Sequence, residues 1–129
     1  MSVKEHVYIT DLHFEHNVWK NELAFYKEEI GIFEDRLGEI SQRWTDTDVM
    51  AQLERFQNQY IREREVIDIL NHDINRRQQA LVEFAKDHPI ALDHIHFQDH
   101  EDMRNRMETF RKIYGELKND FLAFIRKYL

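Results

Sequence analysis

Apolar residues recur along this 129-residue chain at alternating spacings of four and three. Side chains at that spacing form one continuous stripe along an α-helix, as in helices that pack side by side in coiled coils. The rhythm holds inside three long stretches and slips only at the two short breaks between them. We therefore expect an all-α protein with three long helices, over about residues 10–43, 47–87 and 95–128.

Both breaks contain residues that start or end helices. The segment TDTD, Thr45 to Asp48, offers hydroxyl and carboxylate groups that cap a new helix, and Pro89 ends the helix before it. Short connections favour antiparallel neighbours, so the chain is predicted to form one domain, residues 1–129, folded as an antiparallel three-helix coiled-coil bundle. Two boundaries stay open: helix 1 starts at Ser2 or Thr10, and helix 3 starts by Asp93 or after Asp99.

Charged residues beside the stripes predict how the helices are arranged, because helix 3 can lie on either side of helix 1. On one side, acidic residues of helix 1 meet basic residues of helix 3, and Arg106 reaches Asp73 of helix 2. On the other side, charges of like sign meet. The first arrangement is favoured, and the pairs it predicts between helices 1 and 3 are Glu15 and Glu22 with Arg111 and Lys118.

Three positions inside the stripes are polar: His16, Glu63 and Arg77. The predicted register puts His16 and Arg77 in one layer with Met107. Polar residues in a coiled-coil seam commonly fix its register while their tips reach water. The alternative is a small internal polar pocket near His16, Arg77 and Asp73, because a buried arginine needs an acid or an anion beside it.

Helix 1 carries a second apolar stripe opposite its core stripe. A three-helix bundle needs one apolar face per helix, and large apolar side chains left in water promote aggregation. Beside this stripe, Gly31 belongs to a set of small residues at heptad spacing, where another helix can approach closely. We predict that this face binds a second copy, giving a homodimer, or a partner protein, through Phe14, Val18, Phe25, Gly31 and Ile32.

Seven of the eight histidines fall at one predicted end of the bundle. If helix 3 begins by Asp93, two of its histidines lie one turn apart on its inner face. Imidazoles at that spacing can hold a divalent transition metal ion such as zinc. The predicted ligands are His16, His96 and His100, with His13 or His88 as alternatives. The other interpretation is a polar bundle end that tolerates histidines without binding metal.

Three long helices with a tryptophan early in the first, Trp19, resemble a spectrin repeat in outline. The segment HFEHNVWKNELAFYKEEI, His13 to Ile30, is similar to short bacterial helical-bundle proteins of uncharacterised function. This second likeness covers mainly helix 1. Both resemblances imply a helical bundle, and neither implies an activity or a functional residue.

Composition narrows the classes of function. A formal net charge of −7 gives no general attraction to nucleic acid or anionic lipid, and the lack of cysteine excludes thiolate metal ligands and cysteine nucleophiles. The sequence has no apolar run of membrane-spanning length and no signal-peptide core, so a cytoplasmic protein is expected. It has no phosphate-binding glycine loop either. We expect a non-enzymatic, cofactor-free protein that acts through protein–protein association, with metal or small-ligand binding at the histidine-rich end as the alternative.

Overall fold

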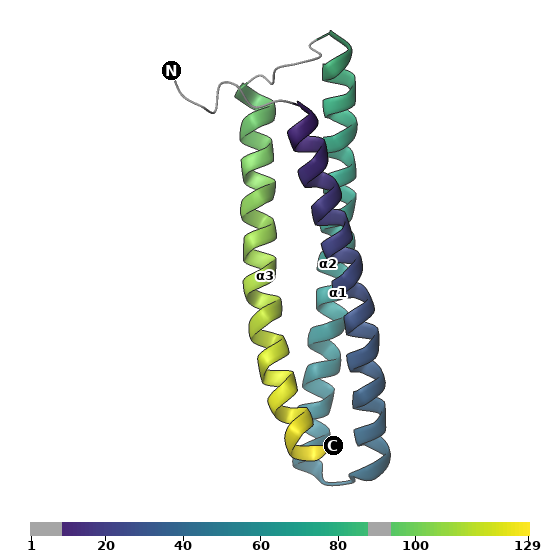
Figure 1. The fold of residues 1–129 in the computed structure, drawn as a ribbon. Helices are drawn as coiled ribbons and strands as arrows, with labels where there is room; N and C mark the ends of the chain where they lie inside the picture. The colour runs from purple at the N-terminus through teal and green to yellow at the C-terminus, as the bar shows by residue number, and fades with distance from the viewer. Residues whose placement is uncertain (1–8, 88–93) are drawn as a thin grey trace.

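The computed structural model describes residues 9–87 and 94–129, which form three long helices with no strand among them (Figure 1). Helix α1 spans Ile9–Arg43, α2 spans Thr47–Asp87 and α3 spans His94–Tyr128. A short turn joins α1 to α2 at one end of the bundle, and α3 runs parallel to α1, so that the C-terminus lies near that turn (Figure 1). The predicted all-α class and helix bounds are confirmed, the bounds to within one residue.

The predicted core stripes are buried on all three helices. On α1 the buried positions follow the spacing of four and three from Ile9 to Ile40. Aromatic rings fill the part of the core near the α1–α2 turn: the ring centroid of Phe121 lies 4.6 Å from that of Phe33 and 5.4 Å from that of Tyr60. Each ring buries roughly 150–250 Å² of surface, so this half of the bundle anchors the three helices against one another.

Trp44 closes the bundle at the α1–α2 turn. Its indole Nε1–H donates a hydrogen bond to the backbone carbonyl of Tyr128 at 2.8 Å, and the two rings meet edge to face with centroids 5.3 Å apart. The last turn of α3 is thereby tied to the α1–α2 connection. The opposite end of the bundle contains the beginnings of α1 and α3 and the end of α2, and it holds the histidine cluster described below.

Helix α3 lies on the predicted side of α1 but is shifted by one heptad from the predicted register. Arg106 contacts Asp73 of α2 at 2.8 Å, as predicted. Glu22, however, pairs with Arg111 instead of Lys118, with Arg111 Nε 2.5 Å from a carboxylate oxygen. The predicted pairing between α1 and α3 was therefore wrong by seven residues.

The observed register gives Glu15, Glu22 and Glu29 of α1 each a basic partner on α3. Glu15 accepts a hydrogen bond from Arg104 at 2.7 Å, and Glu29 accepts one from Lys118 at 3.0 Å. The predicted register would have set Glu29 against the apolar Ile125 and left Arg104 without an acid on α1. A three-pair ladder, together with the aromatic contacts, accounts for the shift.

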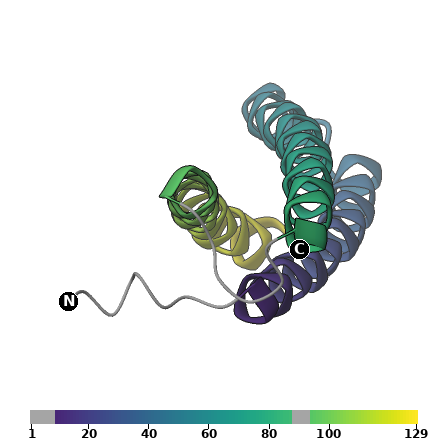
Figure 2. The ribbon, with the colours of Figure 1, turned by 90° about the horizontal axis from the view of Figure 1, so that it is seen from above.

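Viewed along its axis, the bundle is asymmetric: α1 and α2 run close together, whereas α3 stands further away (Figure 2). This separation leaves surface grooves on both sides of α3, one against α1 and one against α2. The grooves and the outer side of α1 are the surfaces on which a partner or ligand could bind.

Candidate association face, groove and buried histidine cluster

The outer face of α1 exposes large apolar side chains. Phe14 is 70% exposed, Val18 43%, Phe25 56% and Ile32 58%. We name these four residues the α1 outer face. Their exposed surface amounts to roughly 400 Å², a size at which apolar patches on monomeric proteins are often functional. Four of the five predicted association residues are therefore accessible in the single chain.

Gly31, the fifth predicted association residue, lies toward α2. A Cβ atom added to Gly31 would lie 3.9 Å from Nη2 of Arg64, and the residue is half-buried. Arg64 is itself paired with Glu34 of α1. A Cβ at this position would make only an ordinary van der Waals contact with Arg64, so the packing of α1 against α2 does not require the glycine. Gly31 lies beside the outer face without belonging to it.

The α1 outer face continues toward α3. Phe14 and Val18 also line a groove of about 380 Å³ between α1 and α3, together with Trp19, Arg104 and Arg111. Further along α1, the remaining outer-face residues follow Val18 at steps of seven. The apolar surface therefore extends over several turns of α1, with a basic margin supplied by α3.

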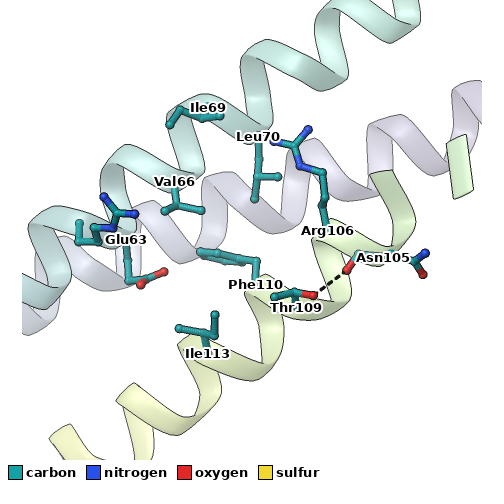
Figure 3. A pocket seen from close by; sticks show the side chains of 10 residues that line it. Glu63, Val66, Ile69, Leu70, Asn105, Arg106, Thr109, Phe110 and Ile113 are labelled. Carbon is teal, nitrogen blue, oxygen red and sulfur yellow. Dashed lines mark hydrogen bonds between the residues drawn. The ribbon is translucent and has the colours of Figure 1, made fainter. Parts of the chain in front are cut away.

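A second apolar surface, absent from the sequence predictions, lies between α2 and α3. It is a groove of about 480 Å³ to which α2 contributes Glu63, Val66, Ile69 and Leu70 and α3 contributes Asn105, Arg106, Thr109, Phe110 and Ile113 (Figure 3). Ile69 and Ile113, one on each wall, are 55% and 49% exposed. Apolar spacing along each helix could not reveal this groove, because it arises from the distance between α2 and α3.

Glu63, one of the polar residues predicted inside the apolar stripes, lines this groove, and most of its side chain is buried. Its exposed fraction is 8%, and its carboxylate has no ion-pair or hydrogen-bond partner among the described residues. Burial raises the pKa of Glu63, and this effect outweighs the opposing charge of Arg62. The oxygens of Glu63 are not among the fully buried polar atoms, so the carboxylate meets the solvent of the groove while the rest of the side chain is buried, and its partial desolvation opposes folding.

At the other end of the bundle, two predicted metal ligands lie side by side. The ring centroids of His16 and His100 are 5.2 Å apart, and the exposed fractions of these residues are 0% and 3%. The indole of Trp19 stacks on His100 with centroids 4.9 Å apart. The sequence predicted that His16 shares its layer with Met107 of α3. The observed neighbour on α3 is His100, seven residues before Met107, because α3 is shifted by one heptad.

Glu15 holds the imidazole of His100 from outside the core. Nε2 of His100 pairs with the Glu15 carboxylate, which also accepts the hydrogen bond from Arg104. Burial raises the pKa of Glu15, but the hydrogen bonds from Arg104 and His100 outweigh it and leave the pKa below its usual value. Burial also lowers the pKa of His100, despite the opposing influence of Glu15. At neutral pH the pair is thus a carboxylate and a neutral imidazole.

This protonation state fixes the tautomer of His100. An ionised carboxylate can only accept hydrogen bonds, so Nε2 of His100 carries the hydrogen and donates it to Glu15. Nδ1 of the neutral ring then has a free lone pair. That atom is buried and has no hydrogen-bond partner. Both ring nitrogens of His16 are also buried, and Gln78 is the hydrogen-bonding side chain that acts on this ring.

A small cavity of about 30 Å³ lies between the two histidines and the adjoining turn of α2. It is lined by His16, Arg77, Ala80, Leu81, Asp99 and His100. Arg77 is only half-buried, with Nη1 3.7 Å from the Asp99 carboxylate, while its Nε is buried without a partner. The predicted internal polar pocket thus contains His16 and Arg77, whereas Asp73 lines a separate surface pocket with Arg77.

The environment of His16 keeps it neutral. Burial lowers its pKa from 6.5 to about 4, and the nearby charges of His100 and His13 act in the same direction. Its ring is 6.4 Å from that of His13, measured between centroids. Neutral imidazoles have a lone pair that can accept a hydrogen or bind a metal ion.

The remaining predicted ligands are not brought into this cluster by the described residues. His96 lies within α3, which begins at His94, but its side chain is outside the described part of the structure, and His88 is outside it entirely. Among the side chains that are described, no group of three or more histidine, aspartate or glutamate residues is arranged to hold one metal ion.

None of the three described helices is both long enough and apolar enough to cross a membrane. Comparison with protein-family models, with curated proteins and with solved structures finds no match for this chain. A function is therefore inferred from the chain's own surfaces and buried polar groups.

Proposed function

We propose that this protein acts through protein–protein association rather than catalysis, with a second copy of the chain bound to the α1 outer face. The observation that carries the proposal is the exposure of Phe14, Val18, Phe25 and Ile32, between 43% and 70%, on a helix whose opposite face already fills the core. Large exposed apolar patches mark association sites, and symmetric homodimers are the commonest oligomers of soluble proteins.

The spacing of the outer face suits a two-fold axis through Phe25. Val18 and Ile32 lie seven residues before and after Phe25. When two α1 helices pack antiparallel about this axis, Phe25 meets its own copy and Val18 meets Ile32 of the second copy. Every outer-face residue at the heptad positions then contacts another apolar side chain, as an isologous interface requires.

The apolar area is comparable with what a dimer needs. The three heptad residues of each outer face expose roughly 280 Å², so two copies would give about 14 kcal/mol of gross stabilisation at about 25 cal/mol per Å². Association costs about 4–15 kcal/mol in lost freedom, so contacts at the margin of the face, those of Phe14 included, contribute to the net stability of the dimer. With polar residues at its margin, each copy would approach the roughly 800 Å² that one partner buries in a standard interface.

A matched pair of charge substitutions tests the proposal. Phe25→Glu places a carboxylate at the axis, while Ile61→Glu introduces the same group at a similarly exposed residue of α2, 50% exposed against 56% for Phe25. Each Phe25 ring would bury roughly 110 Å² on association, so two copies contribute about 5 kcal/mol and their loss raises Kd more than about a thousandfold. Sedimentation equilibrium measures Kd for both variants.

The proposal expects a wild-type dimer, a monomeric Phe25→Glu variant and a dimeric Ile61→Glu variant, all with the same helical circular dichroism. Because Phe25 is exposed in the single chain, its replacement should leave the monomer folded. A monomeric wild-type protein contradicts the proposal. So does dissociation by Ile61→Glu alone, which would move the interface to α2.

A further inference from the structure

Buried polar atoms without hydrogen-bond partners surround the cavity at the histidine-bearing end of the bundle. Nδ1 of His100 and Nε of Arg77 are buried without a hydrogen bond, and so is at least one ring nitrogen of His16, whose only nearby hydrogen-bonding side chain among the described residues is that of Gln78. Buried polar atoms are nearly always satisfied in folded proteins, because each unsatisfied one costs about 1–3 kcal/mol. Several such atoms from all three helices around one cavity of about 30 Å³ indicate a binding site for something small.

The available atoms are mainly electron-pair donors. Nδ1 of His100 has a free lone pair because Nε2 carries the hydrogen that binds Glu15. Neutral His16 also has one unprotonated ring nitrogen with a free lone pair. Imidazole nitrogens are the ligands preferred by zinc, copper and nickel ions, whereas calcium and magnesium prefer oxygen.

The spacing of the two rings fits one shared metal ion. An imidazole nitrogen binds zinc at about 2.0–2.1 Å, which puts the ion about 3.2 Å from the ring centroid. Two imidazoles on a tetrahedral ion then have their centroids about 5 Å apart. The observed separation of His16 and His100 is 5.2 Å, which permits a shared ion and also lies in the range of ordinary ring packing. The unpaired nitrogens, and not the spacing, therefore indicate the ion.

The surrounding charges complete the pattern of a metal site. Imidazoles that bind metal usually donate their other ring hydrogen to a carboxylate, which orients the ring and makes the ligating nitrogen more basic. Glu15 makes this contact with His100 and is itself held by Arg104. On the cavity wall, the positive charge of Arg77 is opposed by Asp99, 3.7 Å away.

From these contacts we propose that His16 and His100 bind one divalent transition metal ion, with Glu15 as the positioning residue of His100. The cavity has room for about one water-sized particle, which suits a single ion. The two imidazoles are the protein ligands, since the described side chains offer no group of three. The cavity itself holds only the ion, so exchangeable water completes the coordination from the solvent side, next to the half-exposed Asp99. Such a site follows the order of intrinsic affinities, with copper(II) bound more tightly than nickel(II) or zinc.

Titration of the untagged full chain with copper(II), nickel(II) or zinc chloride at neutral pH tests the site. We expect one ion per chain by isothermal titration calorimetry, and a zinc-dependent change in the nitrogen NMR signals of two histidine rings. His100→Gln should abolish this binding, and Glu15→Gln should weaken it about 10- to 100-fold by releasing the ring. His72→Ala is the matched control, because His72 is exposed on α2, and it should bind like the wild type.

Three results would overturn the proposal: no stoichiometric metal uptake, uptake that His100→Gln leaves unchanged, or uptake that depends on His72. Water alone in the cavity would give the first result. Circular dichroism of each variant confirms that loss of binding does not come from unfolding. The site is independent of the α1 outer face, so Phe25→Glu should bind metal like the wild type whether or not the wild-type chain dimerises.

Discussion

Acid should destabilise the metal-free protein through His16. Burial, with the charges of His100 and His13, lowers the pKa of this residue from 6.5 to about 4 in the folded chain. The unfolded chain, with a pKa near 6.5, binds a proton below that pH, and the folded chain does not. Protonation therefore favours unfolding as the pH falls from about 6.5 to about 4, and the effect levels off below about 4.

The magnitude follows from the two pKa values. The difference between 6.5 and about 4 corresponds to about 3 kcal/mol of unfolding free energy, at about 1.4 kcal/mol for each pH unit. Small domains have only about 5–15 kcal/mol of stability in total, so this loss is large. His16 is fully buried, which means that solvent does not screen the effect.

Urea unfolding of the wild type and of His16→Leu, from about pH 7 to about pH 4 with a chelator present, isolates this contribution. The carboxylates and His100 titrate in both proteins, whereas His16 titrates only in the wild type. The wild type should lose about 3 kcal/mol more than the variant over this range. A difference of less than about 1 kcal/mol would refute the reasoning that burial keeps His16 neutral.

Three further predictions concern stability in urea at neutral pH. Glu63→Leu should stabilise the chain by about 1 kcal/mol, because it removes a partly desolvated carboxyl group that has no partner among the described residues, and a loss of stability would show that the carboxyl is paired in solution. A double-mutant cycle of Arg111 with Glu22 should give a coupling of about 0.5–1 kcal/mol, and a cycle of Arg111 with Glu15 should give about zero; the opposite result would restore the predicted register. Phe121→Ala should cost about 3–5 kcal/mol, since the ring is 1% exposed, and a cost below about 2 kcal/mol would contradict its place in the core.

The helices could be predicted closely because their signal is local. An unbroken rhythm of apolar residues, interrupted at TDTD and at Pro89, sets both the number of helices and their bounds. The side of α1 on which α3 packs was also predictable, since acidic residues of α1 meet basic residues of α3 on that side, whereas charges of like sign would meet on the other. These features depend on spacing along one helix or on the sign of charge beside it.

The register of α3 was not predicted, because a heptad repeat matches itself after every shift of seven residues. The choice between registers depends on which residues fall at the ends of the ladder. Had Glu29 been compared along with Glu15 and Glu22, the observed register would have been favoured. Glu29 faces Lys118 in the observed register and the apolar Ile125 in the predicted one. The pairing of His16 with His100 follows from the same shift.

The functional surfaces were predicted unevenly for a related reason. The α1 outer face is a property of one helix, so its exposed residues could be found by spacing alone, except for Gly31, whose neighbour Arg64 comes from α2. The α2–α3 groove depends on how far two helices stand apart, and the cavity beside His16 depends on three helices meeting. The spacing of apolar residues along one helix does not determine the distances between helices on which the groove and the cavity depend.

Cysteine cross-linking tests the central claim, association through the α1 outer face about a two-fold axis at Phe25, most directly. The natural chain has no cysteine, so an introduced pair reports one contact. In the proposed dimer, Val18→Cys on one copy lies opposite Ile32→Cys on the other. Two copies of Val18→Cys lie about 20 Å apart along the helix. They are too far apart for a disulfide, which needs Cα atoms within about 7 Å. Mixing the two variants under oxidising conditions should give the mixed disulfide dimer, and neither variant alone should cross-link. Cross-linking of Val18→Cys with itself, or no cross-linking in the mixture, would contradict this account.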